Sequence, residues 1–406
     1  MAAMSRRASF LIGLATVSAG PAVLAANLGA AASAFGPSYV WRFLTWGRRE
    51  NTVNDTFFPR RDIPVSTRPA PLPWALQPGR VERALGRGPL QRFMDTTQTQ
   101  ALLVAEHGRI VFEGYANGAG PATPLGSRSM AKSVLAMLVG AAIAEGRIAG
   151  IEAPMEALLP GVPGLAGSGV LLRHMLQMGG GLRFRGDDAP LGPLTAEPLW
   201  DGTRVAYFVP GLRRYLATAR QGGPVGARFF YDDRSAQLVG WALERAFGTS
   251  LSQAVAERFW TPMGAEFPAS WSLNSAGDGL EKSESGIDAA ARDWLKLGQV
   301  VLNDGAGLLL PGWITEMTRP ATPTPSGYYD SNAEVPRYPG LFYARLWWGW
   351  AREGGPSDAF MHGLYGQVVY VCRARGVVAV RLGVDYGGVD HWPALLRGMI
   401  DRMGPR

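Results

Sequence analysis

Residues 124–146 read PLGSRSMAKSVLAMLVGAAIAEG, with a Ser-x-x-Lys pair, Ser129 and Lys132, at the start of a long apolar run. The run is apolar almost all round, which predicts a buried helix over 130–146. Residues three apart on a helix share a face, so the two side chains can touch. Two interpretations are open. Either Ser127 or Ser129 caps a core helix while Lys132 reaches solvent, or Ser129 is a nucleophile with its base one turn away.

The lysine of this pair is unusual in this chain. The sequence has 40 Lys and Arg residues, and only Lys132, Lys282 and Lys296 are lysines. Burial lowers the pKa of a lysine toward the range in which the neutral amine acts as a base, whereas an arginine keeps its proton. A serine near a helix N-terminus also lies where unpaired N–H groups favour developing negative charge. Both observations favour the nucleophile.

Composition restricts the class of protein. The chain has 406 residues, of which 47% are hydrophobic and 18% charged, so a large folded core is expected. The net charge of +7 comes from scattered basic residues, and no zinc-finger, RRM or P-loop spacing occurs, so no nucleic-acid partner is expected. Four histidines without metal-ligand spacing predict neither a metal site nor a cofactor.

The N-terminus has the pattern of an export signal. Two arginines, Arg6 and Arg7, precede an uncharged stretch from Phe10 to Tyr39. Residues 1–36 are therefore expected to be a cleaved signal peptide or a retained membrane anchor, with the bulk of the chain outside the cytoplasm, periplasmic or attached to the inner membrane. The alternative is an ordinary buried helix at the start of the domain. Residues 37–80, rich in Pro, Arg and aromatics, are expected to form an extended linker.

Residues 81–406 are expected to form one domain of the α+β class. Strand-like runs flank His107-Gly108 near one end of this region and Arg375-Gly376 near the other, which predicts two hairpins. Between them, helices are expected over 130–146, 170–178, 234–247, 250–260 and 288–303, and loops over 160–168, 179–192 and 261–287. This order predicts an antiparallel sheet formed by both termini, flanked by helices, with a mostly helical subdomain inserted into it.

Two further segments bear on Ser129. In GARFFYDDRSAQLVGWALERAF (226–247), Tyr231 lies at a junction before a helix, where it either presents its hydroxyl to a cleft or packs in the core. In MHGLYGQVVYV (361–371), Gly363 and Gly366 precede an apolar strand. Glycines there either allow a ligand to approach closely or simply form a loop. A backbone N–H of this strand, paired with that of Ser129, would complete an oxyanion hole.

The order and spacing of these segments resemble the serine β-lactamase/penicillin-binding-protein family. The Ser-x-x-Lys element is the nucleophile motif of that superfamily. The closer resemblance is to its class C-like branch, which includes esterases, DD-peptidases and 6-aminohexanoate-dimer hydrolases, and it covers roughly residues 95–385. The segments that carry it are SRSMAKS, LLRHMLQMGGGL, FYDDRSAQLVGWALERAFGTSLSQAVAERFWTPMGAE, SGIDAAARDWLKLGQVVLNDG and GLYGQVVYV.

The resemblance implies roles for individual residues. Ser129 would be the acylated nucleophile, Lys132 its base partner and Tyr231 the proton relay to the leaving group. The N–H groups of Ser129 and Gln367 would form the oxyanion hole. An ester or amide would acylate Ser129, and water would then release the product.

Two departures from the family pattern narrow the chemistry. The Lys-Thr-Gly strand element is matched to Leu364-Tyr365-Gly366, which lacks the lysine that holds the carboxylate of β-lactams. Asp233 replaces the Asn or Ser of the tyrosine element, and a carboxylate there favours the protonated form of Lys132. Tyr231 is then the more plausible proton acceptor.

Substrate contacts are expected from Tyr365 and Gly366 of the strand element, from Asp187 in the loop GGGLRFRGDDAPLG (179–192) and from His362. The alternative for Asp187 is a solvated polar loop. No Gly-x-Ser-x-Gly element surrounds any serine, so a Ser-His-Asp triad is not expected.

These residues predict an exported serine acyl hydrolase that acts on a small ester or linear amide. The alternative is a penicillin-binding-like protein, or a β-lactamase or DD-peptidase, that acylates slowly and serves as a sensor or binder. A structural membrane-attached protein would require the Ser129, Lys132 and Tyr231 trio to be coincidental. The sequence predicts no oligomeric state.

Overall fold

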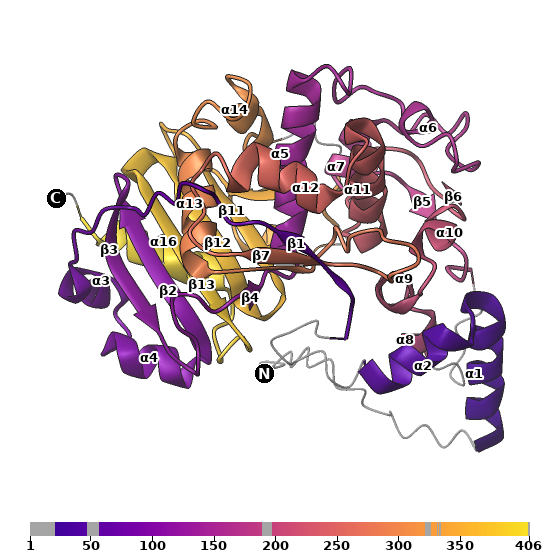
Figure 1. The fold of residues 1–406 in the computed structure, drawn as a ribbon, viewed down its shortest axis with the longest axis horizontal. Coiled ribbons are helices and arrows are strands. Elements are labelled where there is room, and N and C mark those ends of the chain that lie inside the picture. Colours follow the sequence, from indigo (N-terminus) through magenta and orange to yellow (C-terminus); the bar gives the residue numbers. More distant parts are fainter. Residues whose placement is uncertain are drawn as a thin grey trace.

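A computed structural model describes residues 21–46, 57–188, 197–320, 326–330, 332 and 334–404. The expected hairpins lie next to each other in one antiparallel sheet of seven strands, in the order β3-β2-β13-β12-β11-β10-β9 (Figure 1). The strands are β2 (Thr99–Glu106), β3 (Arg109–Tyr115), β9 (Leu341–Ala344), β10 (Trp347–Trp350), β11 (Asp358–Gly363), β12 (Gln367–Cys372) and β13 (Val377–Gly383). This confirms the α+β fold with a sheet built from both ends of the chain.

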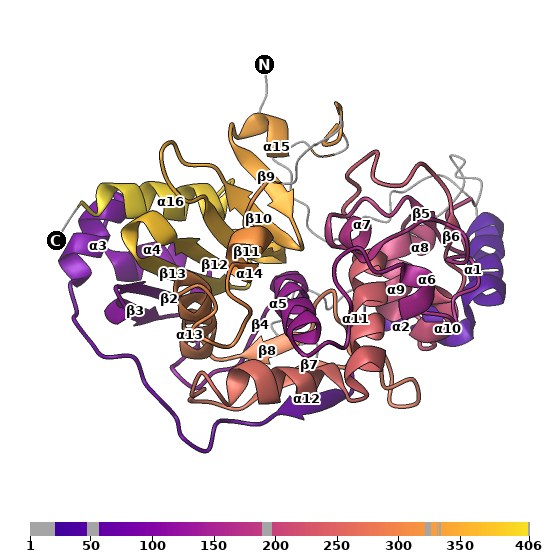
Figure 2. The same cartoon turned by 90° about the horizontal axis from the view of Figure 1, so that it is seen from above.

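Helices cover both faces of this sheet. Figure 2 shows α13 (Ala291–Leu302) on one face and α16 (Trp392–Arg402) on the other. The helix predicted over 130–146 is α5 (Met130–Ala144), which packs against β10, β11 and β12. Smaller helices near the sheet are α3 (Pro78–Leu85), α4 (Leu90–Thr96), α14 (Trp313–Met317) and α15 (Glu334–Arg337), with 3₁₀ turns at Leu364–Gly366 and Arg373–Arg375.

The inserted region is mostly helical, as predicted. It contains α6 (Met155–Leu158), α7 (Leu172–Leu176), α8 (Glu197–Trp200), α9 (Gly202–Phe208), α10 (Leu212–Leu216), α11 (Asp233–Phe247) and α12 (Leu251–Val255), which continues as a π-helix (Ala256–Trp260). A two-stranded ribbon, β5 (Leu182–Arg183) with β6 (Arg220–Gln221), lies in the same region. The amphipathic helix α11 packs against α5, which brings the tyrosine segment next to the nucleophile helix.

A second sheet was not predicted. Its order is β1-β7-β8-β4, with β1 (Arg60–Ile63), β7 (Ala269–Ser272), β8 (Ile287–Ala289) and β4 (Leu125–Gly126). The expectation of loop over 261–287 is therefore wrong, and the helix expected from 288 begins at Ala291. These strands have two to four residues and pair with distant segments, so no local hydrophobic period marks them.

The linker prediction for residues 37–80 is wrong in its first part. Residues Pro37–Trp46 form the helix α2, whose Tyr39 and Phe43 are buried. Their spacing of four residues places both side chains on one helical face, which packs against the helical region. Helix α1 (Pro21–Phe35) precedes α2, and both lie at the end of the molecule away from the seven-stranded sheet (Figure 1).

The two expectations for residues 1–36 fall partly outside the described residues, because residues 1–20 are not among them. Within the part of the chain that the structure describes, no helix is long and apolar enough to cross a membrane.

Candidate active site

The nucleophile candidate lies on a sharp turn between β4 and α5. Strand β4 is held by β8, and the Ser127 amide donates to the Ile287 carbonyl at 2.7 Å. Arg128 then adopts a φ of 49°, in the left-handed region that L-residues rarely occupy. The turn places Ser129 at the N-cap of α5, half-buried, but its hydroxyl makes no capping hydrogen bond. The capping interpretation is therefore wrong for Ser129.

The hydroxyl of Ser129 is instead engaged by Lys132. Lys132 Nζ donates to Ser129 Oγ at 2.8 Å, as the spacing of three residues predicts. The lysine side chain is 1% exposed, so it does not reach solvent. Its Nζ also donates to the Glu284 carbonyl oxygen at 2.8 Å and lies 2.6 Å from Asp233 Oδ1. The interpretation of Lys132 as a solvated surface lysine is wrong.

The charge on Lys132 is set by its neighbours. Burial lowers the pKa of this amine, but the negative charge of Asp233, together with Tyr231 and Glu284, outweighs burial and raises the pKa above its ordinary value. The lysine is therefore held as an ammonium. This contact agrees with the prediction that a carboxylate at position 233 favours the protonated form of Lys132.

Tyr231 completes this group. Its ring lies under Lys132 Nζ, 5.0 Å from the ring centroid. Burial raises the pKa of Tyr231, whereas the Lys132 charge and the neighbouring Ser129 hydroxyl lower it, and the net shift is upward. The structure thus brings together the three side chains that the sequence singled out.

Aromatic side chains surround Tyr231. Its ring stacks on Trp348 at a centroid distance of 6.3 Å and meets the ring of Tyr343 edge-on at 5.9 Å. Phe229 lies against Tyr343 at 5.1 Å. Sequence reasoning missed Tyr343 and Trp348, because they lie on β9 and β10, more than 110 residues after Tyr231. They give the site an apolar wall.

The strand that approaches Ser129 is β11, at Gly363. A Cβ at Gly363 would lie 3.1 Å from the Ser129 nitrogen and 2.5 Å from the Ser127 carbonyl oxygen. Only a glycine fits this approach of a strand to the nucleophile turn. Leu364 is the next residue in the chain, so its backbone N–H comes directly after the residue that contacts the Ser129 turn.

The structure places Gln367 elsewhere. It pairs with Gly363 across the β11–β12 hairpin, and its side-chain amide is bound to Gly383 through Nε2 at 2.6 Å and Oε1 at 2.9 Å. The contact of Gly363 with the Ser129 turn favours the segment at Gly363 over the predicted Gln367 N–H as the strand side of an oxyanion hole. Gly363 and Gly366 lie three residues apart, and either glycine could have allowed a close approach to Ser129, so the sequence did not distinguish them.

Two predicted substrate contacts have structural partners instead. A Cβ at Gly366 would lie 2.1 Å from Trp392 Cδ1, so this glycine is required by helix α16. Tyr365 is buried, with a φ of 66°, and the Arg128 guanidinium lies 5.6 Å from its ring centroid. Tyr365 therefore supports the nucleophile turn from behind.

Asp187 and His362 lie near the site but with partners of their own. Asp187 Oδ1 is 2.5 Å from Arg234 Nη1, and its other oxygen accepts from the Phe184 amide at 2.9 Å. It lines a cleft of about 490 Å³ within the helical region, beside the start of α11. The His362 ring lies 5.9 Å from that of His391, and burial lowers its pKa to about 3, so the ring is neutral.

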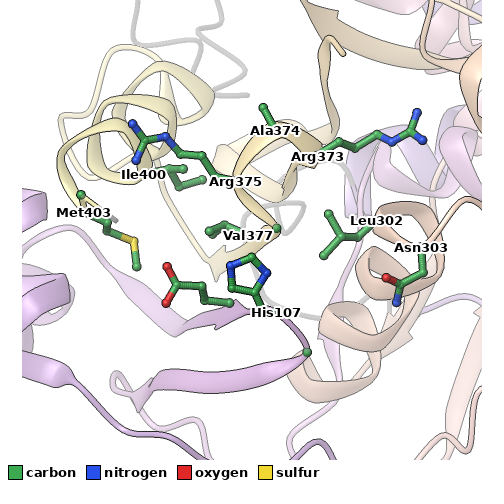
Figure 3. A pocket seen from close by; sticks show the side chains of 13 residues that line it. His107, Leu302, Asn303, Arg373, Ala374, Arg375, Val377, Ile400 and Met403 are labelled. Carbon is green, nitrogen blue, oxygen red and sulfur yellow. The ribbon is translucent and has the colours of Figure 1, made fainter. Parts of the chain in front are cut away.

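A larger cavity, of about 700 Å³, lies at the far end of the hairpins (Figure 3). Arg373 and Arg375 line it, at the opposite end of β12 from the Gly363 contact. Its charged residues are already paired: Glu106 with Arg80 at 2.8 Å, and Arg373 with Asp304 at 3.5 Å. Its lining contains neither a serine nor a lysine, so the nucleophile group around Ser129 is the better candidate site.

Comparison with known proteins agrees with this geometry. The family model described as Beta-lactamase matches residues 90–387. The 6-aminohexanoate-dimer hydrolase of Paenarthrobacter ureafaciens is 26% identical over 327 residues, covering 77% of this chain and 79% of that protein.

Two solved structures show the same fold. A putative 6-aminohexanoate-dimer hydrolase from Bacillus anthracis has a TM-score of 0.65 at 23% identity and covers 89% of this chain and 93% of its own. EstCE1, a hydrolase with promiscuous acyltransferase activity, has a TM-score of 0.61 at 17% identity and covers 80% and 99%. With the family match spanning most of its length, the chain belongs to the beta-lactamase family of serine hydrolases.

Proposed function

We propose that this protein is a serine acyl hydrolase that cleaves an ester or a linear amide through an acyl-enzyme on Ser129. The observation that carries this proposal is the 2.8 Å contact between Lys132 Nζ and Ser129 Oγ in a buried site. The names of its relatives support the substrate class, since one is a 6-aminohexanoate-dimer hydrolase and another has acyltransferase activity.

In the proposed mechanism, Tyr231 takes the proton of Ser129 while Lys132 remains an ammonium. Asp233 at 2.6 Å keeps the proton on Lys132, and the positive charge favours the phenolate of Tyr231. Ser129 Oγ then attacks the acyl carbon, and Tyr231 returns the proton to the leaving alcohol or amine. A water molecule, activated in the same way, releases the acid and restores Ser129.

The oxyanion of the tetrahedral intermediate would be bound by backbone N–H groups. The Ser129 N–H lies at the N-terminus of α5, where the helix dipole favours negative charge. The Leu364 N–H, which follows the contact of Gly363 with Ser129, is the second donor in this proposal.

The site does not favour β-lactams. The strand residues before Gly363 are Met361, which is fully buried, and a neutral His362, so neither supplies a cation for a carboxylate. No lysine is present whether the Lys-Thr-Gly element is matched to residues 361–363 or to residues 364–366. We propose a slow rate for penicillins compared with simple esters. Export, with or without attachment to a membrane, also remains our proposal.

The experiment uses the full chain with a fluorophosphonate probe and p-nitrophenyl acetate. We expect stoichiometric labelling, located on Ser129 by intact mass and peptide mapping, and its loss in Ser129→Ala. Ser33→Ala, at an exposed position of α1, serves as the matched control and should still be labelled. Absence of labelling, or labelling that persists in Ser129→Ala, would overturn the proposal.

A further inference from the structure

Two of the three lysines in this chain contact one residue, Glu284. Lys132 Nζ donates to the main-chain oxygen of Glu284 at 2.8 Å, and Lys282 Nζ lies 3.2 Å from Glu284 Oε1. Glu284 is 3% exposed and Lys282 is fully buried. The mechanism proposed above uses neither the Glu284 carboxylate nor Lys282.

The side chain of Glu284 is fixed on several sides. The Gln237 amide on α11 donates to Oε2, and the Ser285 hydroxyl donates to Oε1 at 3.3 Å. Ser283 in turn donates to Gln237 Oε1 at 3.0 Å. The loop around Glu284 is thereby attached to the helix that begins at Asp233.

The same loop is also attached to the nucleophile turn. It leads directly into β8, which pairs with β4 just before Ser129, and the Ile287 amide donates to Ser127 Oγ at 3.2 Å. One short stretch of chain therefore positions the Glu284 carbonyl oxygen relative to both Lys132 and Ser129. A displacement of the Glu284 side chain would move an acceptor of the Lys132 ammonium.

The charges around Glu284 are balanced. Lys132 faces it from α5, Asp233 from α11 and Lys282 from its own loop, so two ammonium groups meet two carboxylates. Apart from Glu284, Lys282 contacts the Tyr207 carbonyl at 2.9 Å and the rings of Tyr207 and Phe58. These groups carry no net charge to offset a buried ammonium. A buried charge that has lost its partner acts strongly on nearby groups, because the surroundings screen it little.

We infer that Glu284 is a positioning residue of the proposed reaction, which holds the Lys132 ammonium through its carbonyl oxygen and offsets the charge of Lys282 through its carboxylate. The inference rests on the proposed function, since it concerns the charge at the same site. Without the carboxylate, the added positive charge favours loss of a proton from both Tyr231 and Lys132. The pH range of the reaction then moves.

The test measures the pH dependence of Ser129 acylation by p-nitrophenyl acetate in the full chain. Activity should rise as the base forms and fall as Lys132 loses its proton. In Glu284→Gln, both limbs are expected to move to lower pH, by about one unit. In Lys282→Met, which leaves an uncompensated carboxylate, both limbs should move to higher pH. The double variant restores the balance, so its limbs should return close to those of the wild type.

The matched control uses the third lysine of the chain, Lys296, and its partner Glu266. Lys296, also buried, lies 2.9 Å from Glu266 Oε1 on a different part of the fold. Glu266→Gln should lower the thermal unfolding midpoint without moving either limb of the pH profile. This separates loss of stability from a change of charge at the site.

Opposite shifts in the two single variants, cancelled in the double variant, would establish the role of Glu284. If Glu284→Gln does not fold, Lys282→Met and the double variant still give the comparison. Limbs that coincide with those of the wild type in all folded variants would overturn the inference while leaving the proposed function intact. Failure of the wild type to acylate Ser129 would instead overturn the proposed function.

Discussion

Three acceptors surround the amine of Lys132. Ser129 Oγ, the Glu284 carbonyl oxygen and Asp233 Oδ1 lie at 2.8, 2.8 and 2.6 Å from Nζ. An ammonium has three N–H donors, so each finds a partner. The geometry fits a lysine that orients Ser129 and stabilises negative charge on its neighbours, and leaves the phenol of Tyr231 to accept the proton.

Replacing Lys132 by arginine tests whether charge alone is sufficient. The guanidinium is planar and larger, so it cannot direct three donors from one atom to these acceptors. We expect Lys132→Arg to acylate at least about 10²-fold more slowly than the wild type, nearly as slowly as Lys132→Ala. Rates with p-nitrophenyl acetate measure this. An arginine variant within tenfold of the wild type would contradict the geometric requirement.

Replacing Asp233 by asparagine tests what holds the proton on Lys132. The Asp233 charge raises the pKa of both Lys132 and Tyr231, so its removal lowers both. The limb at which the base forms and the limb at which Lys132 loses its proton should both move to lower pH, by about one to three units. The pH dependence of kcat/KM measures this shift.

The control for Asp233→Asn is Glu244→Gln on the same helix. Glu244 is paired with Arg213 at 2.8 Å on the part of α11 remote from Tyr231. Its pH profile should coincide with that of the wild type. Equal shifts in the two variants would show that a general change in charge, rather than the contact with Lys132, sets the profile.

The predictions made from the sequence at single residues succeeded where the information was local. Ser129 and Lys132 lie one helical turn apart, so their contact follows from spacing. The strand residue next to Ser129 was misplaced at Gln367, because Gly363 and Gly366 both fit a close approach and only the sheet register decides between them. Glu284 gave no signal, since its contact with Lys132 spans 152 residues.

At the scale of elements, α5 is held by a close contact in its middle. A Cβ at Gly140 would lie 2.4 Å from Trp313 Nε1, and this indole donates to the Ala136 carbonyl at 3.2 Å. The glycine therefore allows α14 to pack directly on the nucleophile helix. A methyl group at this position forces the two helices apart.

Gly140→Ala should lower the free energy of unfolding by about 1–3 kcal/mol, as expected for overpacking of a core. The gain in helix propensity of alanine over glycine, about 1 kcal/mol, partly offsets the loss. Denaturant unfolding measures the change. Gly146→Ala is not a suitable control, because Gly146 has a positive φ. The control is Ala144→Ser at an exposed position of α5, which should change stability little. An unchanged midpoint in Gly140→Ala would contradict the packing argument.

The elements that the sequence predicted are long apolar or amphipathic runs, whereas the strands that it missed have only two to four residues. The two hairpins and helices α5, α11 and α13 carry sustained hydrophobic patterns. The strands β4 and β8 have only two and three residues, and their pairing is what connects the Glu284 loop with the Ser129 turn. The part of the fold that positions the site was thus harder to predict than the core that supports it.

At the scale of the whole molecule, helices α1 and α2 pack against the helical region. The Phe35 ring contacts those of Tyr39, Trp200 and Tyr215 at 5.2–6.1 Å, and Arg42 Nη1 donates to the Asn274 carbonyl at 3.0 Å. Phe35 also lies against Gly186, which lines the cleft with Asp187. Cleavage of an export signal after residue 36 would remove this contact.

Phe35→Ala should destabilise this region by about 3 kcal/mol, as for removal of a buried phenylalanine. Limited proteolysis of the full chain measures the effect. We expect the protease to cleave Phe35→Ala faster than the wild type, because α2 and the helical region separate more often. Ser33→Ala, at an exposed position of α1, is the control and should leave the cleavage rate unchanged. Equal rates for Phe35→Ala and the wild type would show that α1 does not support the cleft.

The burial of every lysine has a consequence for how the protein can be handled. Lys132, Lys282 and Lys296 are 1%, 0% and 3% exposed, so the positive surface of the folded chain consists of arginine guanidinium groups. Amine-reactive dyes, crosslinkers and resins will therefore find no side-chain amine on the native protein and will couple through the α-amino group. Coupling at any lysine would report that the molecule has opened.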